Sequence, residues 1–265
     1  MTAVWWLALV MLAIALWTGP LWRPRGLTGV ARPRPWALGH RGVRGSLPEN
    51  TLAAFRAALD AGLDGLETDV QRTRDGALVL VHDFRVAGMR VCDASEAELR
   101  AAVPQLATLA ELLALVRERP GTLLNLELKT VGWNDRRLAA AVATALAASG
   151  LGERLLVSSF SPLALLRLRL RAPRLRTAYL WSEAPGVPWW ARHPWPAPLL
   201  HVDALHPQHP AVTPERVARW RRRGLAVNAW TVNAPADVTR VVAAGVDGVM
   251  GDDPGALLRA LGRAT

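Results

Sequence analysis

Short apolar runs alternate with stretches of helical periodicity over most of this chain. The runs predict strands at residues 36–39, 65–70, 122–128, 155–159, 176–180, 200–204, 226–231 and 248–250. Helices are predicted between most of them, at residues 51–61, 108–117, 134–149, 162–171, 213–223, 235–244 and 254–261. About eight strands separated mostly by helices predict an α/β fold of the (β/α)₈ barrel type, with a doubly wound open sheet as the alternative.

An almost unbroken apolar segment, residues 4–22, precedes this alternating part. It is about long enough to cross a bilayer, and tryptophans, which favour the membrane interface, lie at both of its ends. We therefore expect one transmembrane helix within residues 1–22. A cleaved signal peptide is the alternative, but no basic residue precedes the run and no small-x-small motif follows it.

The next residues, 23–35, are rich in Pro and Arg and predict a short linker before a barrel domain at residues 36–265. Arginines at positions 23, 25, 32 and 34 follow the apolar segment directly. The positive-inside tendency then predicts a single-pass membrane protein whose barrel domain lies in the cytoplasm.

Composition narrows the possible partners. With 265 residues and 51% hydrophobic residues, the chain can bury one large core. The formal net charge of +10 lies wholly beyond residue 22, so the folded part is basic and suits anionic surfaces such as phospholipid. Nucleic acid would also suit this charge, but no nucleic-acid-binding motif is recognisable, and we expect no such partner. A lone cysteine, Cys92, excludes an internal disulfide.

Polar residues interrupt two of the predicted strands at alternate positions. Glu67 and Asp69 share one face of their strand, and Asn125, Glu127 and Lys129 share one face of the next. Parallel barrel strands are normally buried on both faces, so a polar inner face is costly unless it has partners. Three carboxylate ligands predict a hard divalent cation, Ca²⁺ or Mg²⁺, and pairing of each carboxylate with an arginine is the alternative.

Two histidines follow predicted strands. His40 comes after residues 36–39, and His82 comes after the apolar run 79–81. Active sites of barrels form at the carboxyl ends of their strands, and histidine is the side chain that most often transfers protons in catalysis. Two histidines beside a carboxylate cluster therefore favour acid–base chemistry next to a metal, although a single histidine of this kind is more often structural.

The order of the motifs HRG, PENT, ETDV, VHD, NLELK, VSSF, NAWTVN and GVDGVMGDDP resembles that of the glycerophosphodiester phosphodiesterase family. The resemblance covers the chain from residue 37 to its end. It implies a TIM barrel, a divalent cation held by Glu67, Asp69 and Glu127, and hydrolysis of glycerophosphodiesters to an alcohol and sn-glycerol 3-phosphate.

The resemblance also implies roles for individual residues. His40 and His82 match the acid–base pair, and Arg41 and Lys129 match the residues that hold the phosphate. Trp230 matches a wall of the substrate pocket, with packing within the barrel as an equal alternative. The three residues 49–51 precede a predicted helix, and N-capping is their expected role.

Two other functions stay open at this stage. The same site could carry out a lysophospholipase D reaction on membrane lysophospholipids. A catalytically inactive barrel, tethered to the membrane as a binding protein, is the non-enzymatic alternative, although such a protein would not need both proton-transfer groups.

Overall fold

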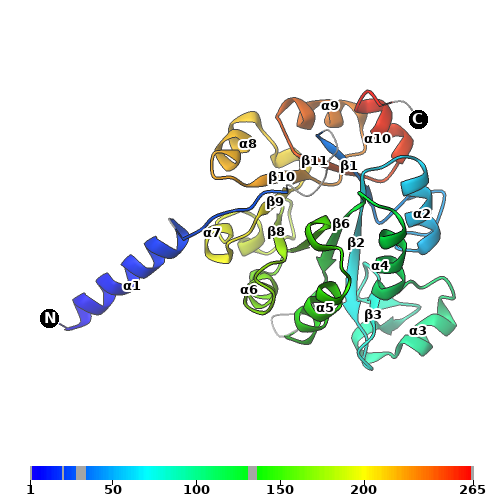
Figure 1. Ribbon diagram of the computed structural model, residues 1–265, viewed down its shortest axis with the longest axis horizontal. Coiled ribbons are helices and arrows are strands. Elements are labelled where there is room, and N and C mark those ends of the chain that lie inside the picture. Colours follow the sequence, from blue (N-terminus) through cyan, green and yellow to red (C-terminus); the bar gives the residue numbers. More distant parts are fainter. Residues whose placement is uncertain (1, 20, 28–33, 131–135, 264–265) are drawn as a thin grey trace.

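The computed structural model describes residues 2–19, 21–27, 34–130 and 136–263, and its central element is a closed barrel (Figure 1). The barrel strands are β1 (Trp36–His40), β2 (Gly65–Arg72), β6 (Leu123–Leu128), β7 (Leu155–Ser159), β8 (Arg176–Trp181), β9 (Ala204–Pro207), β10 (Ala226–Ala229) and β11 (Gly248–Gly251). These eight strands run parallel, and β1 pairs with both β2 and β11. That pairing closes the sheet, so the predicted barrel is confirmed and the open sheet is excluded.

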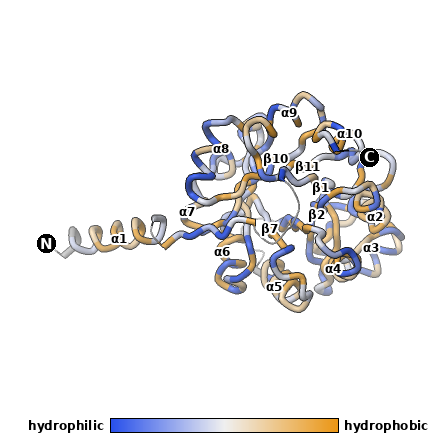
Figure 2. The backbone as a smooth tube through the Cα atoms, turned by 45° about the horizontal axis from the view of Figure 1, so that its top comes forward, coloured by the Kyte–Doolittle hydropathy of each residue, from blue (hydrophilic) through white to orange (hydrophobic). Residues whose placement is uncertain are grey.

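Helices surround the barrel on its outer side (Figure 2). They are α2 (Leu52–Asp60), α4 (Leu109–Glu118), α5 (Arg136–Ala148), α6 (Pro162–Arg171), α7 (Ala197–Leu200), α8 (Pro214–Arg221), α9 (Pro235–Ala243) and α10 (Pro254–Ala260). All predicted helices are present, but the start of the one expected from residue 134 lies outside the described residues. Leu66, Leu124 and Leu126 face outward from neighbouring strands into the core that these helices cover.

The prediction of a strand at residues 200–204 is wrong at its start. Residues 197–200 form the short helix α7, and His201 then takes a left-handed backbone conformation with φ +50°. The strand begins only at Ala204, because such a turn interrupts extended pairing.

The pattern also missed the segment between β2 and α4. Strand β3 (Leu78–Leu80) pairs antiparallel with β2, and a small hairpin joins β4 (Arg85–Val86) to β5 (Met89–Arg90) before α3 (Glu96–Ala102). Strands of two or three residues are too short to show a period of two in the sequence.

The N-terminal helix α1 (Thr2–Thr18) projects away from the barrel beside α7 (Figure 1). It is 17 residues long, shorter than the predicted membrane segment. Gly19 and Pro20 follow it in the sequence, and both disfavour continuation of a helix. In the part of the chain that the structure describes, no helix combines the length and hydropathy needed to cross a membrane, so the expected transmembrane helix is not found.

The residues after α1 lie against the amino-terminal end of the barrel. Trp22 is buried and donates a hydrogen bond from its ring nitrogen to the carbonyl of Val202, at 3.1 Å. Arg25 then pairs with the buried carboxylate of Asp203 at 2.9 Å. These contacts attach the predicted linker, where it is described, to the residues that enter β9.

Candidate active site

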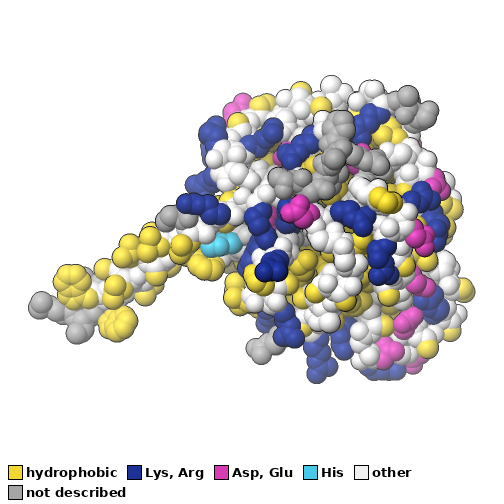
Figure 3. All heavy atoms as spheres, in the orientation of Figure 1, with side chains coloured by type: hydrophobic (Ala, Val, Ile, Leu, Met, Phe, Trp, Pro, Cys, Tyr) yellow, Lys and Arg dark blue, Asp and Glu magenta, His cyan; other side chains and the backbone are white. Residues whose placement is uncertain are grey.

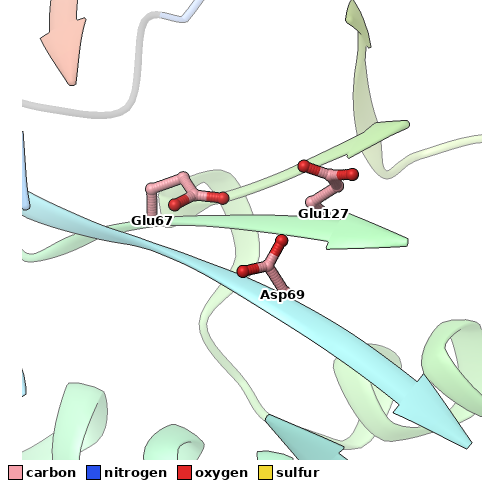
Figure 4. A group of neighbouring side chains, drawn as sticks. All are labelled: Glu67, Asp69 and Glu127. Atoms are coloured by element: carbon pink, nitrogen blue, oxygen red, sulfur yellow. The ribbon is translucent and has the colours of Figure 1, made fainter. Parts of the chain in front are cut away.

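Three carboxylates converge inside the barrel, two from β2 and one from near the carboxyl end of β6 (Figure 4). The two strands are neighbours, and their register places Asp69 opposite Glu127, with Glu67 two residues earlier on the same face of β2. One oxygen atom from each carboxylate lies within 4.8 Å of the others, and all three residues are buried. The paired acidic positions predicted from the sequence are thus brought together.

Two cationic side chains reach this cluster. The Nζ atom of Lys129 lies 3.1 Å from Glu127 and 3.5 Å from Asp69, and Nε of Arg41 lies 3.3 Å from Asp69. The alternative of carboxylate–arginine pairing therefore holds for Asp69. Three carboxylates face two cations among these five residues, which leaves one negative charge without a counterion.

This imbalance perturbs the carboxyl groups. Burial raises the pKa of Glu67 well above its usual range, and the nearby charges of Asp69 and Glu127 raise it further. Burial also raises the pKa of Glu127 to about 7, although the ammonium group of Lys129 opposes this. Buried carboxylate oxygens that repel one another are the donor set of a hard cation, and a divalent ion held by these three residues would remove the repulsion.

His40, the last residue of β1, stands beside the cluster. Its Nε2 atom lies 3.9 Å from Glu67, and its Nδ1 atom lies 2.6 Å from the carboxylate of Asp252. A proton on Nδ1 would be donated to Asp252, which fixes the ring and leaves Nε2 on the side of Glu67. Although burial opposes it, the hydrogen bond from His40 helps to hold the pKa of Asp252 below its ordinary value.

His82 reaches the site by another route than the sequence suggested. It follows β3, which runs antiparallel to β2 and returns toward the carboxylates, so that the amide of Val81 donates to the carbonyl of Asp69 at 3.1 Å. The side-chain amide of Gln71 holds this segment by donating hydrogen bonds to the backbone carbonyls of residues 81–83. Burial lowers the pKa of His82, and the positive charge of Lys129 lowers it further. Its neutral form is therefore favoured near neutral pH.

The loop after β1 supports the cluster from one side. Arg41 has a left-handed backbone, with φ +57°, and its amide donates to the carbonyl of Glu67 at 2.9 Å. Asn50, also left-handed, donates from its side chain to Asp69 at 3.1 Å, and Glu49 accepts from Arg41 at 2.8 Å. Only Thr51 caps α2, so the expectation of N-capping is wrong for Glu49 and Asn50.

Comparison with known proteins agrees with this geometry. Residues 40–256 match the profile of the Glycerophosphoryl diester phosphodiesterase family, and this range contains every residue of the site described above. The chain belongs to this family. It is accordingly an enzyme that hydrolyses glycerophosphodiesters, and the alternative of an inactive binding protein is set aside.

Individual relatives are similar over nearly their whole length. A glycerophosphodiester phosphodiesterase of Caldanaerobacter subterraneus is 30% identical over 237 residues, which cover 83% of this chain and 95% of that protein. A solved structure from Silicibacter pomeroyi is 30% identical with a TM-score of 0.78, covering 90% of this chain and 97% of that one. A phosphodiesterase of Oleispira antarctica, solved in complex with the product sn-glycerol-3-phosphate, is 26% identical with a TM-score of 0.74, and the match covers 86% and 97% of the two chains.

Trp230 follows β10, at the end of this phosphodiesterase barrel that carries the carboxylates and histidines. Its ring nitrogen donates to the carbonyl of His206 at 2.7 Å, and its ring meets that of Phe160 edge to face, with centroids 5.5 Å apart. Phe160 follows β7 and was not assigned a role from the sequence, although it ends the motif VSSF. The two rings form an apolar wall at the carboxyl ends of their strands.

Asp252 is the other residue that sequence reasoning missed. It follows β11 in the motif GDDP, and β11 pairs with β1 so that Gly251 lies opposite Gly39. The next residues along the two strands, Asp252 and His40, then become neighbours. In the sequence, only the position of Asp252 soon after the last predicted strand could have indicated its role. In a closed barrel, that position lies at the end where active sites form.

Proposed function

We propose that this phosphodiesterase depends on a divalent cation and splits glycerophosphodiesters into an alcohol and sn-glycerol 3-phosphate with His40 and His82 as its proton-transfer pair. The observation that carries the proposal is the buried group of Glu67, Asp69 and Glu127, which has more negative charge than Arg41 and Lys129 neutralise. The product found in the Oleispira antarctica relative supports sn-glycerol 3-phosphate as the product here.

Each group has a chemical task in this proposal. A bound Ca²⁺ or Mg²⁺ ion would supply positive charge where the phosphate becomes more negative. Arg41 and Lys129 supply N–H donors for the phosphate oxygens from two sides of the cluster. Trp230 and Phe160 offer an apolar surface to the carbon atoms of the substrate.

The histidines supply and remove protons. One imidazole takes the proton of the attacking hydroxyl group as a new P–O bond forms, and the other protonates the alcohol oxygen as its bond to phosphorus breaks. The carboxylate of Asp252 orients His40, whereas the side-chain amide of Gln71, which donates to backbone carbonyls, positions the segment that carries His82. The attacking group is a hydroxyl of the substrate's own glycerol or a water molecule.

The cation requirement is tested with purified enzyme and glycerophosphocholine, glycerophosphoethanolamine and glycerophosphoinositol. Chelation should abolish turnover, and Ca²⁺ or Mg²⁺ should restore it. Glu67→Gln and Glu127→Gln should each raise the ion concentration needed for half-maximal rate. Full activity in excess chelator would refute the cation requirement.

A substrate whose leaving group needs no protonation can show which of His40 and His82 is the acid and which is the base. A p-nitrophenyl ester of glycerol phosphate leaves without protonation, so it should rescue the variant that lacks the acid and not the variant that lacks the base. His40→Ala and His82→Ala are compared on this ester and on glycerophosphocholine. If both variants keep wild-type rates on both substrates, neither histidine transfers a proton.

Lysophospholipids are the second substrate class. The exposed rings of Trp189 and Trp195, in the segment between β8 and β9, favour contact with lipid. Adding lysophosphatidylcholine to the substrate panel tests this reaction. Release of choline from it at a rate comparable with that from glycerophosphocholine would establish the lysophospholipase D activity.

A further inference from the structure

The end of the barrel opposite the candidate active site carries unpaired positive charge. Helices end and strands begin there, and this end presents exposed arginines whose side chains form no hydrogen bond or ion pair with the described residues. Five of them are Arg23, Arg171, Arg174, Arg222 and Arg223. We refer to this set as the basic end.

Acidic side chains at this end do not offset that charge at the surface. Asp64, Asp203 and Asp247 are buried, and each already pairs with an arginine. The exposed carboxylate of Asp60 pairs with Arg119 at 2.8 Å, and that of Glu153 pairs with Arg176 at 3.1 Å. The arginines of the basic end therefore stay available to an anionic partner.

The apolar helix α1 ends at the same end of the barrel. The ring of Trp17 stacks on His201 with centroids 3.9 Å apart, and its Nε1 donates to the carbonyl of Leu199 at 2.9 Å. These contacts hold the last turn of α1 against the residues that precede β9. Beyond them the apolar side chains of α1 are exposed, with Trp5 and Trp6 67% and 69% accessible (Figure 3).

A large cavity also lies at the basic end, away from the active site. It measures about 1120 Å³ and opens between the carboxyl ends of α5 and α6. Leu146, Leu155 and Leu175 line it, and Arg171 and Arg174 stand on its edge. An apolar groove edged by free arginines matches an acyl chain below an anionic headgroup.

We propose that the basic end docks on a bilayer containing anionic phospholipid, with α1 immersed in the lipid and the arginines at the headgroups. Charge complementarity selects this occupant over a second copy of the chain, because two copies of net charge +10 repel each other. The active-site mouth then faces away from the bilayer. If the proposed phosphodiesterase reaction holds, this orientation favours water-soluble glycerophosphodiesters over lysophospholipids in the same membrane.

Vesicle flotation of the full-length chain tests docking without reference to activity. The protein should float with vesicles of phosphatidylcholine and phosphatidylglycerol, and much less with phosphatidylcholine alone. Arg171→Glu with Arg174→Glu should weaken binding about tenfold or more, since each arginine near an anionic surface contributes measurably. Leu9→Gln with Leu12→Gln should also weaken it, by removing apolar contact from α1.

A matched double variant controls for total charge. Arg90→Glu with Arg137→Glu makes the same change at exposed arginines on elements that follow carboxyl ends of strands. It should bind vesicles like the wild type. Equal losses in both double variants, equal binding to neutral vesicles, or release of the protein by inorganic phosphate at constant ionic strength would overturn the proposal. Turnover of glycerophosphocholine, measured in parallel, reports separately on the catalytic site.

Orientation is tested through the single cysteine. Cys92 lies between β5 and α3, in the segment that connects β2 to α4, away from the basic end. A fluorophore on Cys92 should stay accessible to an aqueous quencher on bound vesicles, whereas one on Arg174→Cys in a Cys92→Ser background should become protected. Protection at Cys92 instead would show the opposite orientation.

Discussion

Lys129 is the single lysine among the 32 Lys and Arg residues, and its surroundings favour a compact cation over an arginine. Its ammonium group is largely buried and lies 3.1 Å from Glu127 and 3.5 Å from Asp69. Lysine offers a compact charge with rotatable donors, whereas the planar guanidinium group is wider and directs its donors rigidly. The added width would displace a carboxylate or, in the proposed reaction, the phosphate.

We therefore predict that Lys129→Arg keeps the fold but lowers kcat/KM by about 10² or more, since a shift of about 1 Å has such an effect on catalysis. Steady-state kinetics and thermal melting measure the two effects. Lys129→Met serves as the control that removes the charge. Wild-type kinetics in Lys129→Arg would show that charge alone is required.

We expect His206 to affect the free energy of unfolding at acidic pH and not to take part in catalysis. It is fully buried under the active site, where its Nε2 lies 3.0 Å from the side-chain amide of Asn228. Burial lowers its pKa from the ordinary 6.5 to about 3. The unfolded chain therefore takes up a proton below pH 6.5 that the folded chain does not, so this site removes stability as the pH falls.

The expected loss from this histidine between about pH 7 and pH 5.5 is about 1 kcal/mol in the free energy of unfolding. His206→Gln should lack this part of the pH dependence, whatever its stability at neutral pH. Urea denaturation of both proteins at the two pH values gives the comparison. Parallel losses in wild type and variant would contradict the assignment.

At the scale of elements, side-chain caps mark where several of the helices begin, among them α2, α4 and α6. Thr108 and Glu111 form a capping box at the start of α4: the amide of Glu111 donates to the Thr108 hydroxyl at 3.3 Å, and the Glu111 carboxylate accepts from the Thr108 amide at 2.7 Å. Leu109, Leu112 and Leu113 of this helix are buried in the core. Loss of the cap therefore acts on a helix that packs against the barrel.

Thr108→Ala should lower the free energy of unfolding by about 1 kcal/mol. Thr144→Ala is the matched control, because the Thr144 hydroxyl is exposed and bonds only within its own helix, to the carbonyl of Ala140. Chemical denaturation should separate the two variants. A Thr144→Ala variant as unstable as Thr108→Ala would show that the cap is not the cause.

At the scale of the whole molecule, closure of the barrel brings three carboxylates together inside it. Their mutual repulsion lowers the free energy of unfolding when no cation is bound. Inward-facing residues at the amino-terminal end are apolar, among them Trp36, Leu38 and Leu156. Nearer the mouth the inner surface carries Glu67, Asp69 and Glu127 instead. Binding of a divalent ion to the folded state alone should therefore raise the free energy of unfolding, by about 2.7 kcal/mol at a hundredfold excess over Kd.

Thermal melting with Ca²⁺, Mg²⁺ and Na⁺ at equal ionic strength measures this stabilisation. The melting temperature should rise with at least one divalent ion and not with Na⁺, and Glu127→Gln should reduce the rise. Because Glu127→Gln removes one of three repelling carboxylates, the variant without added cation should be no less stable than the wild type. Equal melting temperatures under all conditions would rule out a site at these carboxylates.

Periodicity alone was sufficient to predict the barrel and half of the site. Apolar runs at strand spacing gave seven of the eight barrel strands close to their observed positions. Alternation within a strand placed Glu67 with Asp69, and Glu127 with Lys129, on shared inner faces. These features depend on neighbours in the sequence and on the geometry of a strand, so the sequence by itself determined them.

Other contacts of the site were decided only by the tertiary structure, where β11 pairs with β1 and β3 pairs antiparallel with β2. The His40–Asp252 bond joins residues 212 positions apart, and it forms because β11 returns to β1. Val81, which precedes His82, bonds to the carbonyl of Asp69 because β3 reverses against β2. Asn50 does not cap the helix, because its left-handed backbone points its side chain at the Asp69 carboxylate. The end of α1 at Thr18 and its attachment to His201 likewise required the folded molecule. Such pairings leave no periodic trace, since they bring together positions that are adjacent only after the chain has closed on itself.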